Sequence, residues 1–213
     1  MTDYTTDHRI KLETYLASCV LSRGLGRKES ACTLAAINLA MSGELTEKIP
    51  VCMSRVLGSA AVGLQDAMPD EMRNSLRYKS LIPDMPGTGR AQEQERLSVL
   101  LDWLWSVVLP QLQSIAEKGG FGDEWRTMCQ DRTADAARGA ANAAWHHGDC
   151  AAAADVAVAA AVTANARAAD AATIATTVVN SAAAVAAYAD SFWSAIDPIG
   201  VLERMTYLTG DKT

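Results

Sequence analysis

Basic side chains lie on both sides of a proline- and glycine-rich segment, residues 81–90. Guanidinium and ammonium groups bind phosphates and carboxylates through charge-assisted hydrogen bonds. Arg73 and Arg77 stand four residues apart, which places them on one face of the short helix predicted there. A Gly-Thr-Gly triplet then comes before a long helical pattern, whose first amides favour an anion. The pattern predicts an anion-binding site formed by Arg73, Arg77, Lys79, Thr88 and Arg90.

A second basic group, Arg23, Arg27 and Lys28, lies in the first predicted turn between helices. It contributes either to the same site, to which we assign Arg23 and Arg27, or to none. A structural explanation stays open for both groups. The arginines of the first group would then be solvated or paired with Asp70, Glu71 and Asp84, and the helix dipole alone favours cations at a helix C-terminus. The triplet also lacks the spacing and the lysine of a phosphate-binding loop.

The sequence carries none of the short motifs typical of hydrolases or metalloenzymes. It has no Gly-x-Ser-x-Gly elbow and no His-Glu-x-x-His pair. His146, His147 and Cys150 lack the paired spacing of a zinc site, so we expect neither a metal nor a cofactor. The alternative function is a hydrolase or transferase that acts on a nucleotide, with Asp66 and Asp70 near the arginines.

Charge and cysteine usage restrict the partners and the compartment. The net charge of −6 argues against a nucleic-acid partner, because phosphate backbones bind basic surfaces. The five scattered cysteines contain no Cys-x-x-Cys pair, which is typical of free thiols in a reducing compartment. The first ten residues are polar and lack the apolar segment of a secretory signal. We therefore expect a cytoplasmic protein.

Hydrophobic periodicity predicts helices over residues 7–23, 30–43, 50–68, 70–78 and 91–117. Ser30 is expected to cap the second of these helices and Gly43 to end it. Pro50 is expected in the first turn of the third helix, where Gly58 should mark the close approach of another helix. Pro110 should kink the long helix or divide it in two.

The C-terminal part of the chain is dominated by alanine. Residues 131–190 contain 28 alanines out of 60, and alanine has the highest helix propensity. We expect one helix over residues 123–147 and a second over 150–193, with a break near 165–170. A short amphipathic helix over 198–208 should follow.

The expected fold is all-α, a helical bundle with an alanine-rich C-terminal helical hairpin. Residues 1–120 should form an N-terminal helical region, with the alanine-rich region 121–213 packed on it. Alanine side chains bury little apolar area each, so we expect a homo-oligomer that covers these helices. Residues 171–189 are uncharged over 19 positions, close to the length of a spanning helix. Their threonines and the lack of basic flanking residues favour a buried helix, so no membrane partner is expected.

Three features together resemble short alanine-rich proteins of phages and prophages, some of which are labelled immunity-like. They are the Gly-Asp-Glu-Trp-Arg run at 122–126, the alanine-rich stretch after it, and the Leu-Glu-Arg-Met run at 202–205. The resemblance is one of composition over roughly the whole chain and assigns no residue a role. It implies an accessory role in immunity or counter-defence, in the cytosol of a host cell.

The basic cluster and this resemblance lead to one functional hypothesis. The protein is expected to be a non-catalytic binding protein of mobile-element origin. Its partner would be a small anionic ligand, such as a signalling nucleotide that it sequesters, or a host protein that it blocks.

Overall fold

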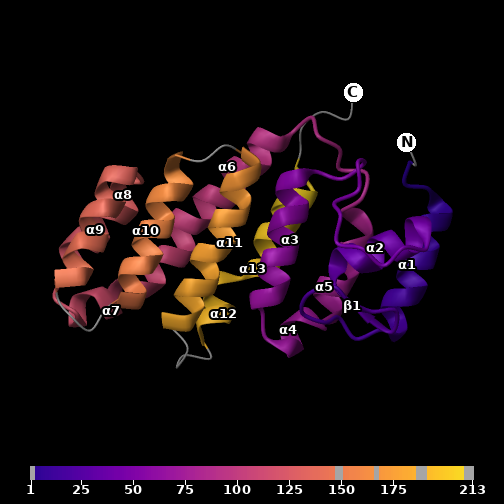
Figure 1. Ribbon diagram of the computed structural model, residues 1–213, viewed down its shortest axis with the longest axis horizontal. Helices are drawn as coiled ribbons and strands as arrows, with labels where there is room; N and C mark the ends of the chain where they lie inside the picture. The colour runs from indigo at the N-terminus through magenta and orange to yellow at the C-terminus, as the bar shows by residue number, and fades with distance from the viewer. Residues whose placement is uncertain (1–2, 147–150, 166–167, 186–190, 209–213) are drawn as a thin grey trace. The chain divides into compact units, whose positions relative to one another are not determined.

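A computed structural model of the chain describes residues 3–146, 151–165, 168–185 and 191–208. Helices dominate these residues, which confirms the predicted all-α class (Figure 1). Among the described residues, the exception is a short antiparallel pair, β1 (Gly26–Arg27) and β2 (Ser30–Ala31). A Cβ atom at Gly26, where φ is +71°, would lie 2.0 Å from the Ser30 carbonyl oxygen. This tight hairpin therefore requires glycine.

The chain folds into two compact units that do not follow the predicted boundary at residue 120. The first unit contains Met1–Arg96 and Leu202–Thr213, and the second contains Leu97–Val201. Most of the long helix predicted over 91–117 belongs to the second unit, because its later turns pack against the alanine-rich helices. The C-terminal end of the chain returns to the first unit.

The first unit is built from short helices joined by turns. They are α1 (Thr6–Ser18), α2 (Thr33–Ser42), α3 (Arg55–Ala67), α4 (Asp70–Arg73), α5 (Leu76–Leu81) and the 3-10 turn η1 (Ile82–Asp84). α2 packs against α1, α3 and η1. Leucines 12, 16, 57 and 64 and Ile37 are buried there and form much of the core.

Two predicted helix starts of this unit are wrong by a few residues, and one predicted helix end is confirmed. α2 begins after Cys32, whose sulfur accepts the capping hydrogen bond, because Ser30 is part of β2. Gly43 ends α2 in the left-handed conformation, as predicted. Ser54 caps α3, so Pro50 lies in the turn before that helix.

The predicted helix over residues 70–78 is divided. α4 ends at Arg73, and α5 begins only after Ser75, whose hydroxyl caps it. Arg73 and Arg77 therefore belong to different helices and do not share a face. At Gly58 of α3, a Cβ atom would lie 2.8 Å from the side chain of Ile49, in the segment before α3. The neighbour that requires this glycine is a loop and not the predicted helix.

A buried hydrogen-bond network joins α2, α3 and α5. The Gln65 side-chain oxygen accepts hydrogen bonds from the Thr33 N–H, at 2.7 Å, and from the Thr33 hydroxyl. The Gln65 side-chain nitrogen donates to the Ser22 carbonyl oxygen at 2.7 Å, and the Tyr78 hydroxyl lies 2.8 Å from the Thr33 hydroxyl. Because buried polar groups require partners, this network fixes the position of α5. Lys79, which follows Tyr78 in α5, is positioned with it.

The second unit contains the remaining helices. They are α6 (Glu93–Trp103, which starts in the first unit), the π turn η2 (Leu104–Val108), the 3-10 turn η3 (Leu109–Leu112), α7 (Gln113–Lys118), α8 (Gly122–Asp131), α9 (Ala134–His146), α10 (Ala151–Asn165), α11 (Ala168–Val185), α12 (Ser191–Ile196) and the start of α13 (Pro198–Thr206). Pro110 divides the long helix, as predicted. Since proline has no N–H and its ring crowds the turn before it, the chain passes through a π turn and a 3-10 turn there.

The alanine-rich helices form a layer in which α10 lies between α9 and α11 (Figure 1). Their buried alanines allow close packing, and α11 also contacts η2 and η3. The helix predicted over residues 123–147 is divided at Arg132, which has a φ of +55° and ends α8. α10 and α11 pack against each other, and the break predicted near 165–170 falls at residues 166–167, which lie outside the described part.

Among the described residues, the stretch that is long and apolar enough to cross a membrane is Glu93–Lys118. The uncharged stretch 171–189 extends beyond the described residues, which stop at 185 there. Core helices of globular proteins meet the same two criteria. Within the second unit, Glu93–Lys118 buries Trp105, Val108 and Leu112, and the Trp103 Nε1–H donates to the Ile196 carbonyl oxygen at 2.6 Å. These contacts are those of a core helix.

Candidate functional site

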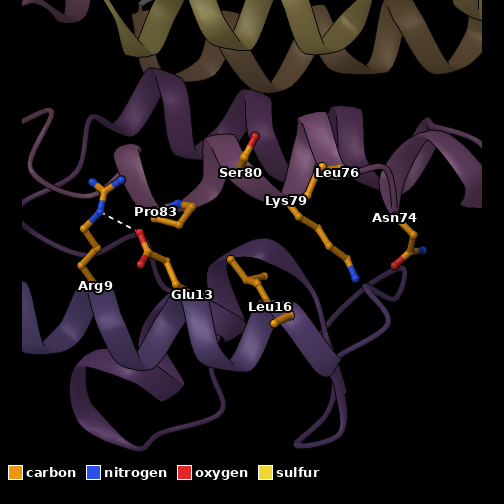
Figure 2. A pocket seen from close by; sticks show the side chains of 9 residues that line it. Arg9, Glu13, Leu16, Asn74, Leu76, Lys79, Ser80 and Pro83 are labelled. Atoms are coloured by element: carbon orange, nitrogen blue, oxygen red, sulfur yellow. Dashed lines mark hydrogen bonds and ion pairs between the residues drawn. The ribbon is translucent and has the colours of Figure 1, made fainter.

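A cleft of about 560 Å³ lies between α1 and the segment formed by α5 and η1 (Figure 2). We call it the α1–α5 cleft. Its volume falls within the ~300–1,000 Å³ typical of small-molecule sites. The two walls run antiparallel, because Arg9 near the start of α1 contacts Asp84 of η1, and Cys19 after its end contacts Lys79 of α5. The lining residues are Arg9, Glu13, Leu16, Ala17, Asn74, Leu76, Lys79, Ser80 and Pro83.

Lys79 supplies a positive charge at one end of the cleft. Its side chain extends from α5 toward the end of α1 (Figure 2), where its Nζ donates to the Cys19 carbonyl oxygen at 2.6 Å. Among the described residues, no carboxylate lies within ion-pair distance of this ammonium group. An ammonium group has three N–H donors. Lys79 can therefore offer two further donors and an uncompensated charge to a ligand.

Asn74 lies at the same end and is held rigidly. Its side-chain oxygen accepts a hydrogen bond from the Leu21 N–H at 2.7 Å, and its side-chain nitrogen donates to the Asp70 carbonyl oxygen at 3.0 Å. These bonds join the segment after α1 to the break between α4 and α5. Asn74 therefore forms a fixed part of the cleft wall, and its side-chain amide is already hydrogen-bonded to the backbone.

The other end of the cleft is acidic on balance. The Arg9 guanidinium donates to Glu13 at 2.8 Å and to Asp84 at 2.5 Å. The hydroxyl of Tyr207, the residue after α13, donates to the second oxygen of Asp84 at 2.5 Å. This hydrogen bond, together with burial, raises the pKa of Tyr207 to about 12, so the residue remains a neutral donor. Two carboxylates therefore face one guanidinium.

Apolar side chains from both walls also line the cleft. Leu16 of α1 and Pro83 of η1 are buried, whereas Leu76 of α5 is 84% exposed. Binding sites for small molecules combine mainly apolar walls with a few placed polar groups. The α1–α5 cleft has this composition, with a cation at one end and an acidic group at the other.

The structure does not bring the predicted site residues together. Arg73 is 1% exposed and is part of the core, where it donates to the Gln65 carbonyl oxygen at 2.8 Å and pairs with Asp70. Arg77 pairs with Glu203 of α13 at 2.6 Å. Of the predicted residues, Lys79 is the one that lines the cleft.

Thr88 and Arg90 lie beside an anion that the protein itself supplies. The Glu93 carboxylate accepts hydrogen bonds from the Ser54 hydroxyl and the Arg55 N–H, each at 2.7 Å, and from the Val56 N–H at 3.0 Å. Burial alone would raise the pKa of Glu93, but these bonds and the nearby Arg90 lower it. The Glu93 carboxylate therefore caps the N-terminus of α3, whereas the sequence predicts the anion site at the N-terminus of the following long helix.

The remaining predicted residues have other positions. Arg23 and Arg27 are exposed at the β1–β2 hairpin and do not line the cleft. The acidic residues of the alternative hypothesis serve structural contacts. Asp66 accepts a hydrogen bond from the Gly24 N–H at 2.9 Å, and Asp70 pairs with the buried Arg73.

Thiol and metal chemistry find no support in the part of the chain that the structure describes. No group of three or more His, Cys, Asp or Glu residues is placed there to hold a metal ion. Burial raises the pKa of Cys32 to about 12 and that of Cys129 to about 11, so both remain protonated thiols near neutral pH. His147 and Cys150 lie outside the described residues.

Sequence reasoning missed the α1 side of the cleft. Arg9 and Glu13 stand four residues apart on an exposed helix face, which is the pattern of an ordinary surface ion pair. Only the packing of η1 against α1 brings Asp84 to the same arginine. A charge pattern along one helix carries no signal for such a contact.

Comparison of the chain with models of known protein families, with curated proteins and with solved structures finds no match.

Proposed function

We propose that this protein is a non-catalytic binding protein that holds a small anionic ligand in the α1–α5 cleft. The observation that carries the proposal is the position of Lys79, which lines a cleft of about 560 Å³. Its ammonium group donates to a carbonyl oxygen and forms no ion pair with a described carboxylate. An uncompensated cation that is partly withdrawn from water favours an anionic partner, because a charge-assisted hydrogen bond contributes about 1.5–3 kcal/mol.

The lining residues favour binding over catalysis. General acid–base chemistry needs two titratable groups opposed across the reacting bond. The cleft is lined by one carboxylate, Glu13, and Arg9 already pairs with it. The hydrolase or transferase alternative depends on Asp66 and Asp70, which form structural contacts outside the cleft.

The resemblance to phage and prophage proteins directs the choice of ligands. Sequestration of a signalling nucleotide would suit an accessory protein in a host cytosol, and a block of a host protein is the other possibility. The proposal includes both sequestration of a nucleotide and a block of a host protein, and one set of binding measurements separates these two functions.

The experiment is calorimetric titration of the full chain with inorganic phosphate, nucleoside mono-, di- and triphosphates, and cyclic dinucleotides. The test variant is Lys79→Gln. The matched control is Lys11→Gln, because Lys11 is exposed on α1 and does not line the cleft. We expect Lys79→Gln to weaken binding about 10- to 100-fold, the equivalent of one charge-assisted hydrogen bond, and Lys11→Gln to leave it unchanged.

The bound molecule is then released by heat and analysed by mass spectrometry. Recovery of the unchanged ligand supports sequestration, whereas a converted ligand supports the enzymatic alternative. Equal affinities in the wild type and in Lys79→Gln would remove the cleft as the anion site. Absence of binding by every anion would leave a host protein as the partner.

A further inference from the structure

We infer that the ligand of the α1–α5 cleft is dipolar, with an anionic group at Lys79 and an amino donor at Glu13. The chemical class that fits is a nucleotide whose base carries an exocyclic amino group. This inference rests on the proposed function of the cleft and defines its ligand more narrowly.

The acidic end of the cleft has a free acceptor. Glu13 uses its Oε1 for Arg9, and its side chain is 49% exposed. Among the described residues, the second carboxylate oxygen has no hydrogen-bond partner. A carboxylate only accepts hydrogen bonds, so this oxygen favours a donor on the ligand and repels a second anion.

The charges of the neighbouring groups strengthen this polarity. Arg9 contributes one positive charge and is shared between two carboxylates, Glu13 and Asp84. Tyr207 adds a neutral donor to Asp84 and no charge. This end of the cleft therefore carries an excess of one negative charge, while the opposite end carries the single positive charge of Lys79.

The distance between the two ends limits the ligand. Lys79 contacts the carbonyl of Cys19, which lies six residues after Glu13. At a rise of ~1.5 Å per residue, these positions are about 9 Å apart along α1. An α-amino acid carries its two charges on neighbouring groups and is too short to contact both ends. The ligand must hold its anion and its donor at opposite ends of a longer body.

The walls between the two ends indicate the nature of that body. Leu16 presents apolar surface between the two ends, while Pro83 lies near Glu13 and Leu76 lies near Lys79 (Figure 2). A nucleoside monophosphate places a flat base and a sugar between its amino group and its phosphate. The base would lie near Glu13 and the apolar side chains, and the phosphate near Lys79.

The test compares three probes in calorimetric titrations of the full chain. They are adenosine monophosphate, purine riboside monophosphate (which has a hydrogen in place of the amino group), and inorganic phosphate. The variants are Glu13→Ala, Lys79→Gln and the control Glu44→Ala, whose glutamate is exposed away from the cleft. We expect the wild type and Glu44→Ala to bind adenosine monophosphate about tenfold more tightly than the analogue. In Glu13→Ala this preference should disappear.

The outcomes separate this inference from the proposed function. If both nucleotides bind the wild type equally well and Lys79→Gln weakens both, the anion site stands and the dipolar ligand is refuted. The same holds if other anions bind in a Lys79-dependent manner while neither nucleotide binds. If no anion binds in a Lys79-dependent manner, the proposed function falls, and this inference falls with it.

Discussion

Removal of the Glu93 carboxylate should destabilise the first unit, because this carboxylate caps α3 from 38 residues away. Its oxygens accept hydrogen bonds from the Ser54 hydroxyl and from the N–H groups of Arg55 and Val56. Thr88 supports the same turn, since its hydroxyl accepts a hydrogen bond from the Ser54 N–H at 3.1 Å. In Glu93→Gln the side chain keeps one acceptor oxygen and loses the charge.

The magnitude follows from the number and the exposure of these bonds. A hydrogen bond to a charged group contributes about 1.5–3 kcal/mol when it is shielded from water. Arg55 is exposed, so water can replace its bond to Glu93, whereas Val56 and Ser54 are buried. We therefore expect Glu93→Ala to lower the free energy of unfolding by about 2–4 kcal/mol and Glu93→Gln by about 1–2 kcal/mol.

The loss should depend on pH in a defined direction. The native pKa of Glu93 lies below its ordinary value, so its carboxylate stabilises the native state fully above the unfolded pKa of ~4.3. This contribution is lost as the pH falls through the native pKa. The difference in unfolding free energy between the wild type and Glu93→Gln should be constant at neutral pH and should shrink in acid.

Urea denaturation followed by circular dichroism, at neutral pH and in an acidic series, measures both effects. Glu95→Gln is the control, since Glu95 is exposed on the same helix and its substitution should stay within about 0.5 kcal/mol of the wild type. A Glu93→Gln protein as stable as this control at neutral pH, or a difference that grows in acid, would refute the capping role.

Three further predictions concern the core, the thiols and the assembly. Gln65→Ala should lower the free energy of unfolding by about 2–4 kcal/mol in denaturant titrations, because Thr33 and the Ser22 carbonyl lose their buried partner; stability equal to that of the wild type would show that the network is dispensable. In the native protein a thiol reagent should modify the partly exposed Cys52 before the buried Cys32, whose pKa is raised to about 12, and mass mapping that finds the reverse order would contradict the burial. Light scattering should show a dimer or larger species that Val158→Glu, on the exposed face of α10, dissociates; a wild-type mass of 22.6 kDa would refute assembly.

The sequence predicts the fold class well because the signals for helices are local. The alanines of 151–165 and 168–185 impose helix through propensity, and Gly43 ends α2 through its backbone freedom. Pro110 divides the long helix because it lacks an N–H. Each of these effects depends only on residues within about one helical turn of each other.

The site could not be predicted in the same way, because its contacts join residues far apart in the chain. Arg73 has the appearance of a surface arginine, but the Gln65 carbonyl and Asp70 hold it in the core. The Glu93 carboxylate lies near Arg90 and offsets its charge. It also caps α3, whose first residue, Arg55, lies 38 positions earlier in the chain. Lys79 belongs to the predicted cluster, but the opposite wall of its cleft comes from α1, which the basic pattern does not include.

The most direct test of the cleft is a nuclear magnetic resonance titration of the isotope-labelled full chain with adenosine monophosphate. The account predicts that amide shifts concentrate in residues 9–17 and 74–83, which form the two walls. The side-chain ammonium signal of Lys79 should move with them, and Lys79→Gln should abolish the response at the same nucleotide concentration. Shifts confined to the second unit, or an equal response in Lys79→Gln, would contradict the assignment of the α1–α5 cleft as the ligand site.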